Sequence, residues 1–139
     1  MGFKIFLDAN IVLDYALKRE NYAELRTIFK WEESGKVNFY ISLSVVHIVN
    51  YFLTKYLGQV IAKTTLLKLL QVISVVDGNH DTVLLAIQNN NPDIEDALQY
   101  EVAYKNRVDY FMSADKLLKK YADHRLPVVN VSEVLAVFS

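Results

Sequence analysis

The sequence predicts an α/β protein in which helices cover both faces of a central, mostly parallel sheet, giving three layers. Short apolar runs alternate along the chain with longer segments whose apolar residues recur at helical spacing. A hydrophobic content of 53% in 139 residues is enough for one core. We therefore expect residues 1–139 to form a single α/β/α domain.

The expected strands are short runs rich in Val, Ile, Phe and Leu, which is typical of strands buried in a parallel sheet. They cover residues 3–7, 37–42, 72–76, 108–112 and 126–131. The expected helices follow Asn10, Asn79 and Ser132, or span residues 22–33, 44–56, 59–70, 93–106 and 115–121. Gly58 separates two of these helices, which we expect to pack as a hairpin over one side of the sheet.

Small polar residues stand where several helices should begin. Asn10 and Ser44 are the expected N-caps of the helices that follow the first and second strands. Asp93, directly after Pro92, is the expected cap of the helix that starts there. Ser132 is the expected cap of the last helix, without the Glu or Gln three residues later that would complete a capping box.

Three aspartates lie where the predicted sheet would bring them to one edge. Asp8 follows the first strand, Asp115 follows the fourth, and Asp96 lies in the first turn of the helix that leads into the fourth. Ligands of open α/β sheets bind beyond the carboxyl ends of the strands. Gathered carboxylates repel one another, and a divalent cation with oxygen ligands relieves that repulsion. Taken alone, each aspartate is better explained as a helix cap or a first-turn charge, and only their joint occurrence in this order indicates a site.

The motifs around these acids resemble those of PIN-domain ribonucleases, a family that includes the toxins of many bacterial toxin–antitoxin pairs. They read Leu7-Asp8-Ala9-Asn10, Asp93-Ile94-Glu95-Asp96-Ala97 and Ser113-Ala114-Asp115. The resemblance covers nearly the whole chain, in the family's order. It implies a metal-dependent endoribonuclease in which Asp8, Asp96 and Asp115 hold Mg²⁺ or Mn²⁺, with Asn10 and Ser113 as substrate-positioning residues. It also implies RNA as substrate, a cognate antitoxin as partner, and a homodimer.

The chain departs from the family pattern at one position. The family usually has a further acid on the helix after the second strand, where this chain has Ile48, and residues 34–76 contain no Asp or Glu. Asp93 is the nearest candidate for a replacement ligand, and the number of ions, one or two, stays open. The alternative function is a PIN-like module with a degraded site that binds RNA or protein.

Composition narrows the class of protein. A net charge of −1 does not favour a strongly basic nucleic-acid binder, and the absence of cysteine excludes disulfides and thiolate metal sites. Residues 37–54 carry no charge, but we interpret them as a strand and a helix rather than a membrane span. We expect no membrane span and no signal peptide. We expect a cytoplasmic location. The charges in residues 34–76 are four lysines, which form either a positive face toward phosphates or ordinary solvated side chains: Lys36, Lys55, Lys63 and Lys68.

Overall fold

The computed structural model describes residues 2–138 and has a five-stranded sheet whose paired strands are all parallel. The strands are β1 (Phe3–Leu7), β2 (Val37–Ser42), β3 (Ile73–Val76), β4 (Tyr110–Met112) and β5 (Val128–Val129). Their order is β3-β2-β1-β4-β5, which makes β1 the central strand. The predicted α/β class with a central parallel sheet is confirmed.

Eight helices are described in residues 2–138. They are α1 (Ala9–Ala16), α2 (Tyr22–Glu33), α3 (Leu43–Leu57), α4 (Gln59–Leu69), α5 (His80–Gln88), α6 (Ile94–Lys105), α7 (Lys116–Tyr121) and α8 (Val131–Phe138). None of these helices is long and apolar enough to cross a membrane. The uncharged stretch from residue 37 to 54 forms β2 and most of α3, as expected.

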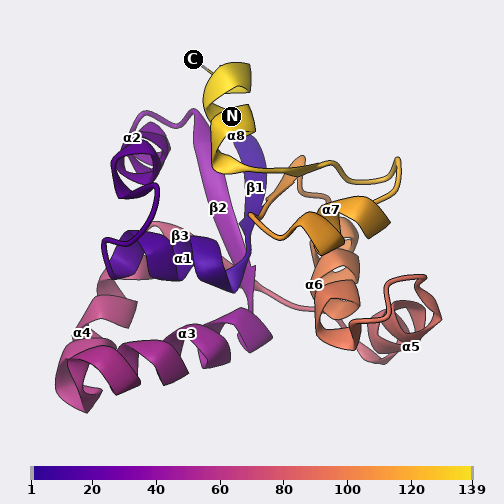
Figure 1. Cartoon of the computed structure of the whole chain (residues 1–139), viewed down its shortest axis with the longest axis horizontal. Helices are drawn as coiled ribbons and strands as arrows, with labels where there is room; N and C mark the ends of the chain where they lie inside the picture. Colours follow the sequence, from indigo (N-terminus) through magenta and orange to yellow (C-terminus); the bar gives the residue numbers. More distant parts are fainter. Residues whose placement is uncertain (1, 139) are drawn as a thin grey trace.

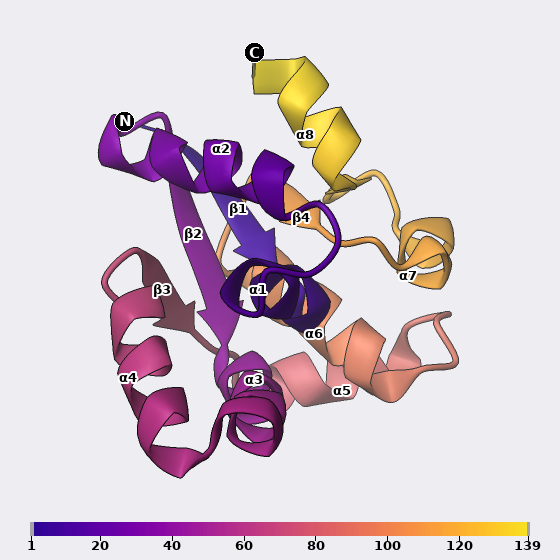
Figure 2. The ribbon, with the colours of Figure 1, turned by 60° about the vertical axis from the view of Figure 1, so that its left-hand side comes forward.

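Strand order decides which helices share a face of the sheet. The chain moves outward from β1 to β2 and β3, and then returns across the sheet to β4. Because parallel crossovers are right-handed, the helices of the outward path lie on one face and those of the return path on the other. Figure 1 shows this division, with α1 to α4 on the left of the sheet and α5 to α7 on the right. Figure 2 shows α3 and α4 as the expected hairpin, and α8 beside α2.

The core explains why β1 is central. Ile5, Phe6 and Leu7 are completely buried, so this strand has neighbours on both faces and both edges. The Phe6 ring lies 4.9 Å from that of Phe111 on β4, and Tyr100 of α6 stacks on Phe111, so Phe6 faces the α6 layer. Alternation along the strand then directs Ile5 and Leu7 toward the other layer. The carboxyl end of β1 is thereby held rigidly at the middle of the sheet.

Three expected caps are wrong because strands run directly into helices without an intervening loop. Asp8, not Asn10, caps α1, and Ser42, not Ser44, caps α3 by accepting a hydrogen bond from the Val45 amide. The last residue of the extended segment provides the cap in both cases. Asn130, not Ser132, caps α8, and β5 is shorter than expected because Val131 is already helical.

Candidate functional site

Asp8 stands at the carboxyl end of the central strand, where β1 meets α1. Its Oδ1 accepts a 2.8 Å hydrogen bond from the Ala9 amide, and its own amide donates to the Met112 carbonyl of β4. The structure thus fixes both the backbone and the carboxylate of Asp8. Burial raises the pKa of this carboxyl above its ordinary value, the hydrogen bonds from Ser113 and Ala9 oppose the rise, and the charge of Asp115 adds to it.

Ser113 joins two of the candidate acids. Its hydroxyl donates to Oδ2 of Asp8 at 2.7 Å and accepts a 3.0 Å hydrogen bond from the Asp115 amide. The Ser113 side chain is buried, and both of its hydrogen bonds are partly buried. Asp115 then caps α7, because its Oδ1 accepts from the amides of Leu117 and Leu118. The ends of β1 and β4 therefore present Asp8 and Asp115 as one hydrogen-bonded unit.

Asp96 reaches the same edge from α6, positioned by a relay through the preceding loop. Oδ1 of Asn89 accepts from the Asn91 amide, Oδ1 of Asn91 accepts from the Asp93 amide, and Oδ1 of Asp93 accepts from the Asp96 amide. Asp93 is thus the N-cap of α6, as expected. Asp93 satisfies a backbone donor in the first turn of α6, and Asn89 and Asn91 satisfy amides of the loop that leads into it, which fixes where α6 begins.

Electrostatics show that the candidate acids share one environment. The pKa of Asp96 is raised to about 7, first by burial and then by the negative charges of Asp93, Asp115, Asp8 and Glu95. Within residues 2–138, none of these five acids forms an ion pair with a basic side chain. An excess of negative charge therefore gathers at this edge without a protein cation to balance it.

The donor chemistry at this edge fits a hard divalent cation. Carboxylate and hydroxyl oxygens are the ligands that Mg²⁺ and Mn²⁺ prefer, and burial together with the negative charges of the neighbouring acids raises the pKa of Asp96. A bound cation would favour the ionised carboxylate against both effects. The side chains do not converge on one point, however: no group of three or more His, Cys, Asp or Glu side chains within residues 2–138 is placed to hold a metal. The oxygen donors and the negative charge at this edge therefore fit a divalent ion. The described side chains, however, do not point toward one common position where such an ion could bind.

The remaining expected site residues lie differently. Asn10 is in the first turn of α1 with an exposed side chain, and no hydrogen bond from it to Asp8, Asp96 or Asp115 is seen in residues 2–138. Ile48 on α3 is partly buried and packs against the hydrophobic core. The position that we assign to the family's further acid is therefore part of the packing of α3.

Sequence reasoning missed a buried polar pair at the end of β2. The Ser42 hydroxyl donates to Oε1 of Gln99, which lies one helical turn after Asp96 on α6. Gln99 is only 4% exposed, and its Nε2 is the one buried side-chain nitrogen or oxygen in residues 2–138 that has no hydrogen-bond partner. The signal that could have found it is a glutamine between Leu98 and Tyr100 on the apolar side of a helix.

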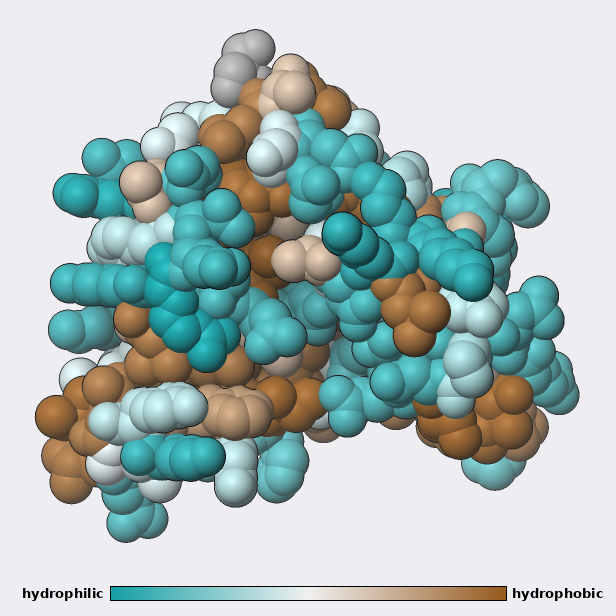
Figure 3. All heavy atoms as spheres, viewed as in Figure 1, coloured by the Kyte–Doolittle hydropathy of each residue, from teal (hydrophilic) through white to brown (hydrophobic). Residues whose placement is uncertain are grey.

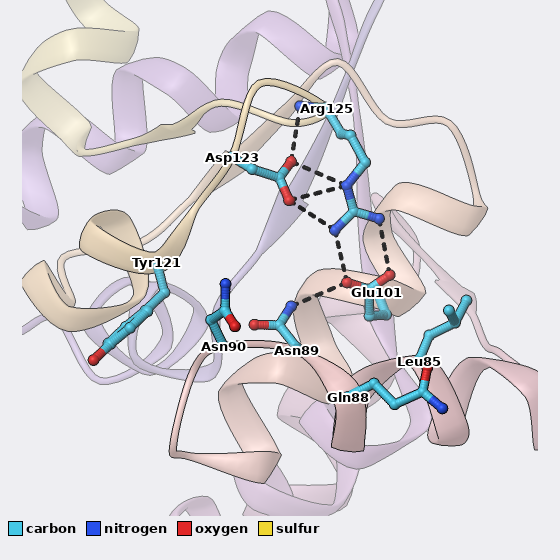
Figure 4. Close-up of a pocket in the computed structure, with 8 residues that line it drawn as sticks. All are labelled: Leu85, Gln88, Asn89, Asn90, Glu101, Tyr121, Asp123 and Arg125. Atoms are coloured by element: carbon cyan, nitrogen blue, oxygen red, sulfur yellow. Dashed lines mark hydrogen bonds and ion pairs between the residues drawn. The ribbon is translucent and has the colours of Figure 1, made fainter.

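A second missed cluster lies in a cavity of about 320 Å³ between α5, α6 and the loop after α7 (Figure 4). Arg125 binds buried Glu101 through two hydrogen bonds, of 2.8 and 3.1 Å, and also pairs with Asp123. Glu101 in turn accepts from Asn89, the first residue of the relay that leads to Asp96. Asp8, Asp96 and Asp115 do not line this cavity, so we treat the cluster as a clasp that holds α6, not as the acidic site.

The fold and the acidic edge together define a class: a parallel α/β protein with carboxylates gathered beyond the ends of its central strands. A family model described as "PIN domain" matches residues 4–117. The chain belongs to the PIN domain family, which confirms the resemblance seen in the motifs. No curated protein matches the chain.

Solved structures with the same fold share little sequence with this chain. VapBC2 from Rickettsia felis, bound to a DNA fragment from their promoter, has a TM-score of 0.69 and 15% identity, covering 92% of this chain and 98% of that one. PAE2754 from Pyrobaculum aerophilum has a TM-score of 0.69 and 17% identity, covering 99% of this chain and 96% of that one. Mycobacterium tuberculosis VapC20, described as a sarcin–ricin loop cleaving toxin, has a TM-score of 0.66 and 15% identity. The match covers 88% of this chain and 98% of that one. At identities of 15 to 17%, this likeness shows a shared fold and nothing more specific.

Proposed function

We propose that this protein is a metal-dependent endoribonuclease and the toxin of a toxin–antitoxin pair. The observation that carries the proposal is the coupled set of Asp8, Asp96 and Asp115 at the carboxyl edge of a PIN-domain sheet. Two structural neighbours, VapBC2 and the sarcin–ricin loop cleaving toxin VapC20, support this choice of function. A cytoplasmic location follows from the proposed substrate, because the RNA that such a toxin would cleave is inside the cell.

The proposed roles divide between ligands and positioning residues. Asp8, Asp96 and Asp115 hold Mg²⁺ or Mn²⁺, with Asp93 as the nearest additional carboxylate. When bound, such an ion lowers the pKa of a water ligand and offsets the negative charge that develops on the phosphate. Ser113 orients the Asp8 carboxylate by its hydrogen bond. Asn10, exposed at the start of α1, is the proposed contact to the substrate phosphate.

Cleavage of a labelled RNA in Mn²⁺ tests the proposal. Asp8→Asn and Asp96→Asn each remove one negative charge and keep the side-chain shape, so both should abolish cleavage while the protein stays folded. Glu95→Gln is the matched control, because it removes one charge from an exposed neighbour of Asp96 on the same helix. Cleavage retained by folded Asp96→Asn, or lost equally in Glu95→Gln, would refute the assignment of the site.

Two observations favour a second function. Ile48 packs against the core, and residues 34–76 contain no carboxylate that could reach the site. In this alternative, the PIN domain has lost metal binding and acts as an RNA-binding or protein-interaction module. Calorimetry separates the two functions. Binding of Mn²⁺ that disappears in Asp8→Asn supports the nuclease, whereas a folded wild type that binds neither Mn²⁺ alone nor Mn²⁺ in the presence of RNA supports the module.

The proposed partners are a cognate antitoxin and a second copy of this chain. The surface of α5 exposes four apolar side chains, which would be covered in a homodimer: Val83, Leu84, Leu85 and Ile87. Figure 3 shows this apolar patch at the lower right of the molecule. Analytical ultracentrifugation of the wild type and of Leu85→Glu, which places a charge in the patch, tests the dimer; equal monomer fractions would refute it.

A further inference from the structure

A groove lies between α1, α2 and α4, close to the start of β3 and away from the acidic site. It consists of two neighbouring cavities, of about 380 and 170 Å³, that share Tyr15 and Val72 in their walls. The first cavity lies between α4 and the ends of α1 and α2 that face it, and the second continues along α2. Figure 1 shows α1, α2 and α4 together on the left of the sheet.

The groove is basic, although the chain as a whole is slightly acidic. Its walls contain Lys18, Lys68, Arg26 and Lys30, against a single acid, Glu33. Within residues 2–138, none of these four cations forms an ion pair, while the neighbouring Arg19 is paired with Asp14. The four positive charges are exposed and available to an anionic ligand. Figure 3 shows the hydrophilic surface over α1 and α2 on the left.

Aromatic rings line the same groove. Tyr15 and Tyr22 are stacked with their centroids 5.9 Å apart, and Nζ of Lys18 lies 5.9 Å from the Tyr22 ring. Tyr15 also stacks on Phe29, which fixes its ring against the core. Half-buried rings next to free cations form the combination that binds single-stranded nucleic acid, because bases stack on the rings while cations contact the phosphates.

We infer that this basic–aromatic groove binds the part of a single-stranded RNA substrate that lies away from the point of cleavage. The inference rests on the proposed nuclease function and extends it to a second region of substrate contact. Helix α1 connects the two regions, since Asp8 caps its first turn and Tyr15 lies in its last. Eight helical residues span about 12 Å, which a strand of a few nucleotides can bridge. An acidic peptide would also meet the cations, but it has no flat bases to place on Tyr15 and Tyr22.

Binding is tested without cleavage, using Asp96→Asn protein in EDTA and a fluorescein-labelled RNA of 15 nucleotides. Lys18→Gln/Lys68→Gln should weaken binding about tenfold and reduce the slope of log affinity against log salt by about 1.4, the value for two lost phosphate contacts. The matched control, Lys55→Gln/Lys63→Gln, removes the same charge from α3 and α4 outside the groove. Tyr22→Leu should weaken binding with an unchanged salt slope. Equal losses in groove and control variants would overturn the inference.

Kinetics distinguish failure of the groove from failure of the nuclease. In an otherwise wild-type chain, Lys18→Gln/Lys68→Gln should raise KM for the 15-nucleotide RNA and leave kcat, and the cleavage of a dinucleotide, unchanged. Cleavage with no difference between groove and control variants refutes the groove alone. Groove-dependent binding in a protein that never cleaves RNA refutes the nuclease alone. Labelled polyglutamate that binds more tightly than RNA, and through the same lysines, overturns the inference in favour of an acidic protein partner.

Discussion

The Ser113 hydroxyl lies 2.7 Å from Oδ2 of Asp8 and accepts the Asp115 amide on its other side. One buried side chain therefore connects the carboxyl ends of β1 and β4, and it supplies one of the hydrogen bonds that hold the pKa of Asp8 down against burial. Ser113 thus stabilises the ionised form of Asp8, which is the form a cation would bind. The role is one of positioning, because the hydroxyl acts through the carboxylate.

Ser113→Ala should lower RNA cleavage by about 10- to 100-fold, the usual effect of removing a hydrogen bond that orients a metal ligand. The loss should be partly reversed by a higher Mn²⁺ concentration or a higher pH, because both favour ionised, metal-bound Asp8. Ser113→Thr keeps the hydroxyl and should retain most of the activity. A pH profile of cleavage that is the same for Ser113→Ala and the wild type would contradict this positioning role.

Asp96→Asn should stabilise the metal-free protein while it abolishes cleavage. The pKa of Asp96 rises on folding from 3.8 to about 7, so its contribution to stability is complete below pH 4 and is lost as the pH increases through 7. The Asp96→Asn variant has no carboxyl group at this position, so it does not lose this contribution to stability as the pH increases. Its advantage in free energy of unfolding should therefore grow from pH 4 to pH 8, to about 1–2 kcal/mol once the partial exposure of Asp96 is allowed for.

Urea unfolding in EDTA at several pH values measures this difference, with Glu95→Gln as the control that should show little change. Addition of Mn²⁺ should reverse the order, because the wild type gains binding energy on folding and the variant loses a ligand. A variant that is equally or less stable than the wild type at pH 8 would mean that burial and the neighbouring charges do not raise the pKa of Asp96 as described above.

Arg125→Ala should destabilise the protein by about 3 kcal/mol, because it leaves the Glu101 carboxylate buried without its cation. For a chain of this length, the melting temperature should fall by about 10 °C. The double variant Arg125→Met/Glu101→Gln removes both charges and keeps an acceptor for Asn89, so it should recover most of the loss. Arg19→Ala breaks the exposed pair with Asp14 and should cost under about 1 kcal/mol. Similar losses in Arg19→Ala and Arg125→Ala would contradict the burial argument.

The fold was predictable because apolar runs and helical spacing are local properties of the chain. The acidic edge was also within reach, because Asp8 directly follows β1 and Asp115 lies three residues after the end of β4, and the carboxyl ends of these strands must meet in a parallel sheet. The clasp of Glu101 and Arg125 was not, since these residues are 24 positions apart and meet only after α6 packs against the loop before β5. The raised pKa of Asp96 likewise depends on burial and on four neighbouring acids from three parts of the chain, which only the folded structure provides.

Caps were the least predictable feature, because several small polar residues compete within two positions. Asp8 and Asn10 are both good caps by type, and so are Ser42 and Ser44. The choice depends on where the strand stops, and pairing decides that: the backbone of Ser42 is still paired with Val76, so it remains extended and can cap the helix that starts next. Sequence alone does not contain this register.

The start of α8 allows a direct test of this point, because two candidate caps differ by two positions. Oδ1 of Asn130 accepts from the Glu133 amide at 2.9 Å, and the Glu133 carboxylate accepts from the Asn130 amide at 3.1 Å, which makes a complete capping box. Asn130→Ala should cost about 1 kcal/mol in urea unfolding, whereas Ser132→Ala should stay within about 0.5 kcal/mol. A larger loss in Ser132→Ala would mean that α8 begins two residues later in solution, and Phe138, which packs edge-on against Phe3, would then have to move.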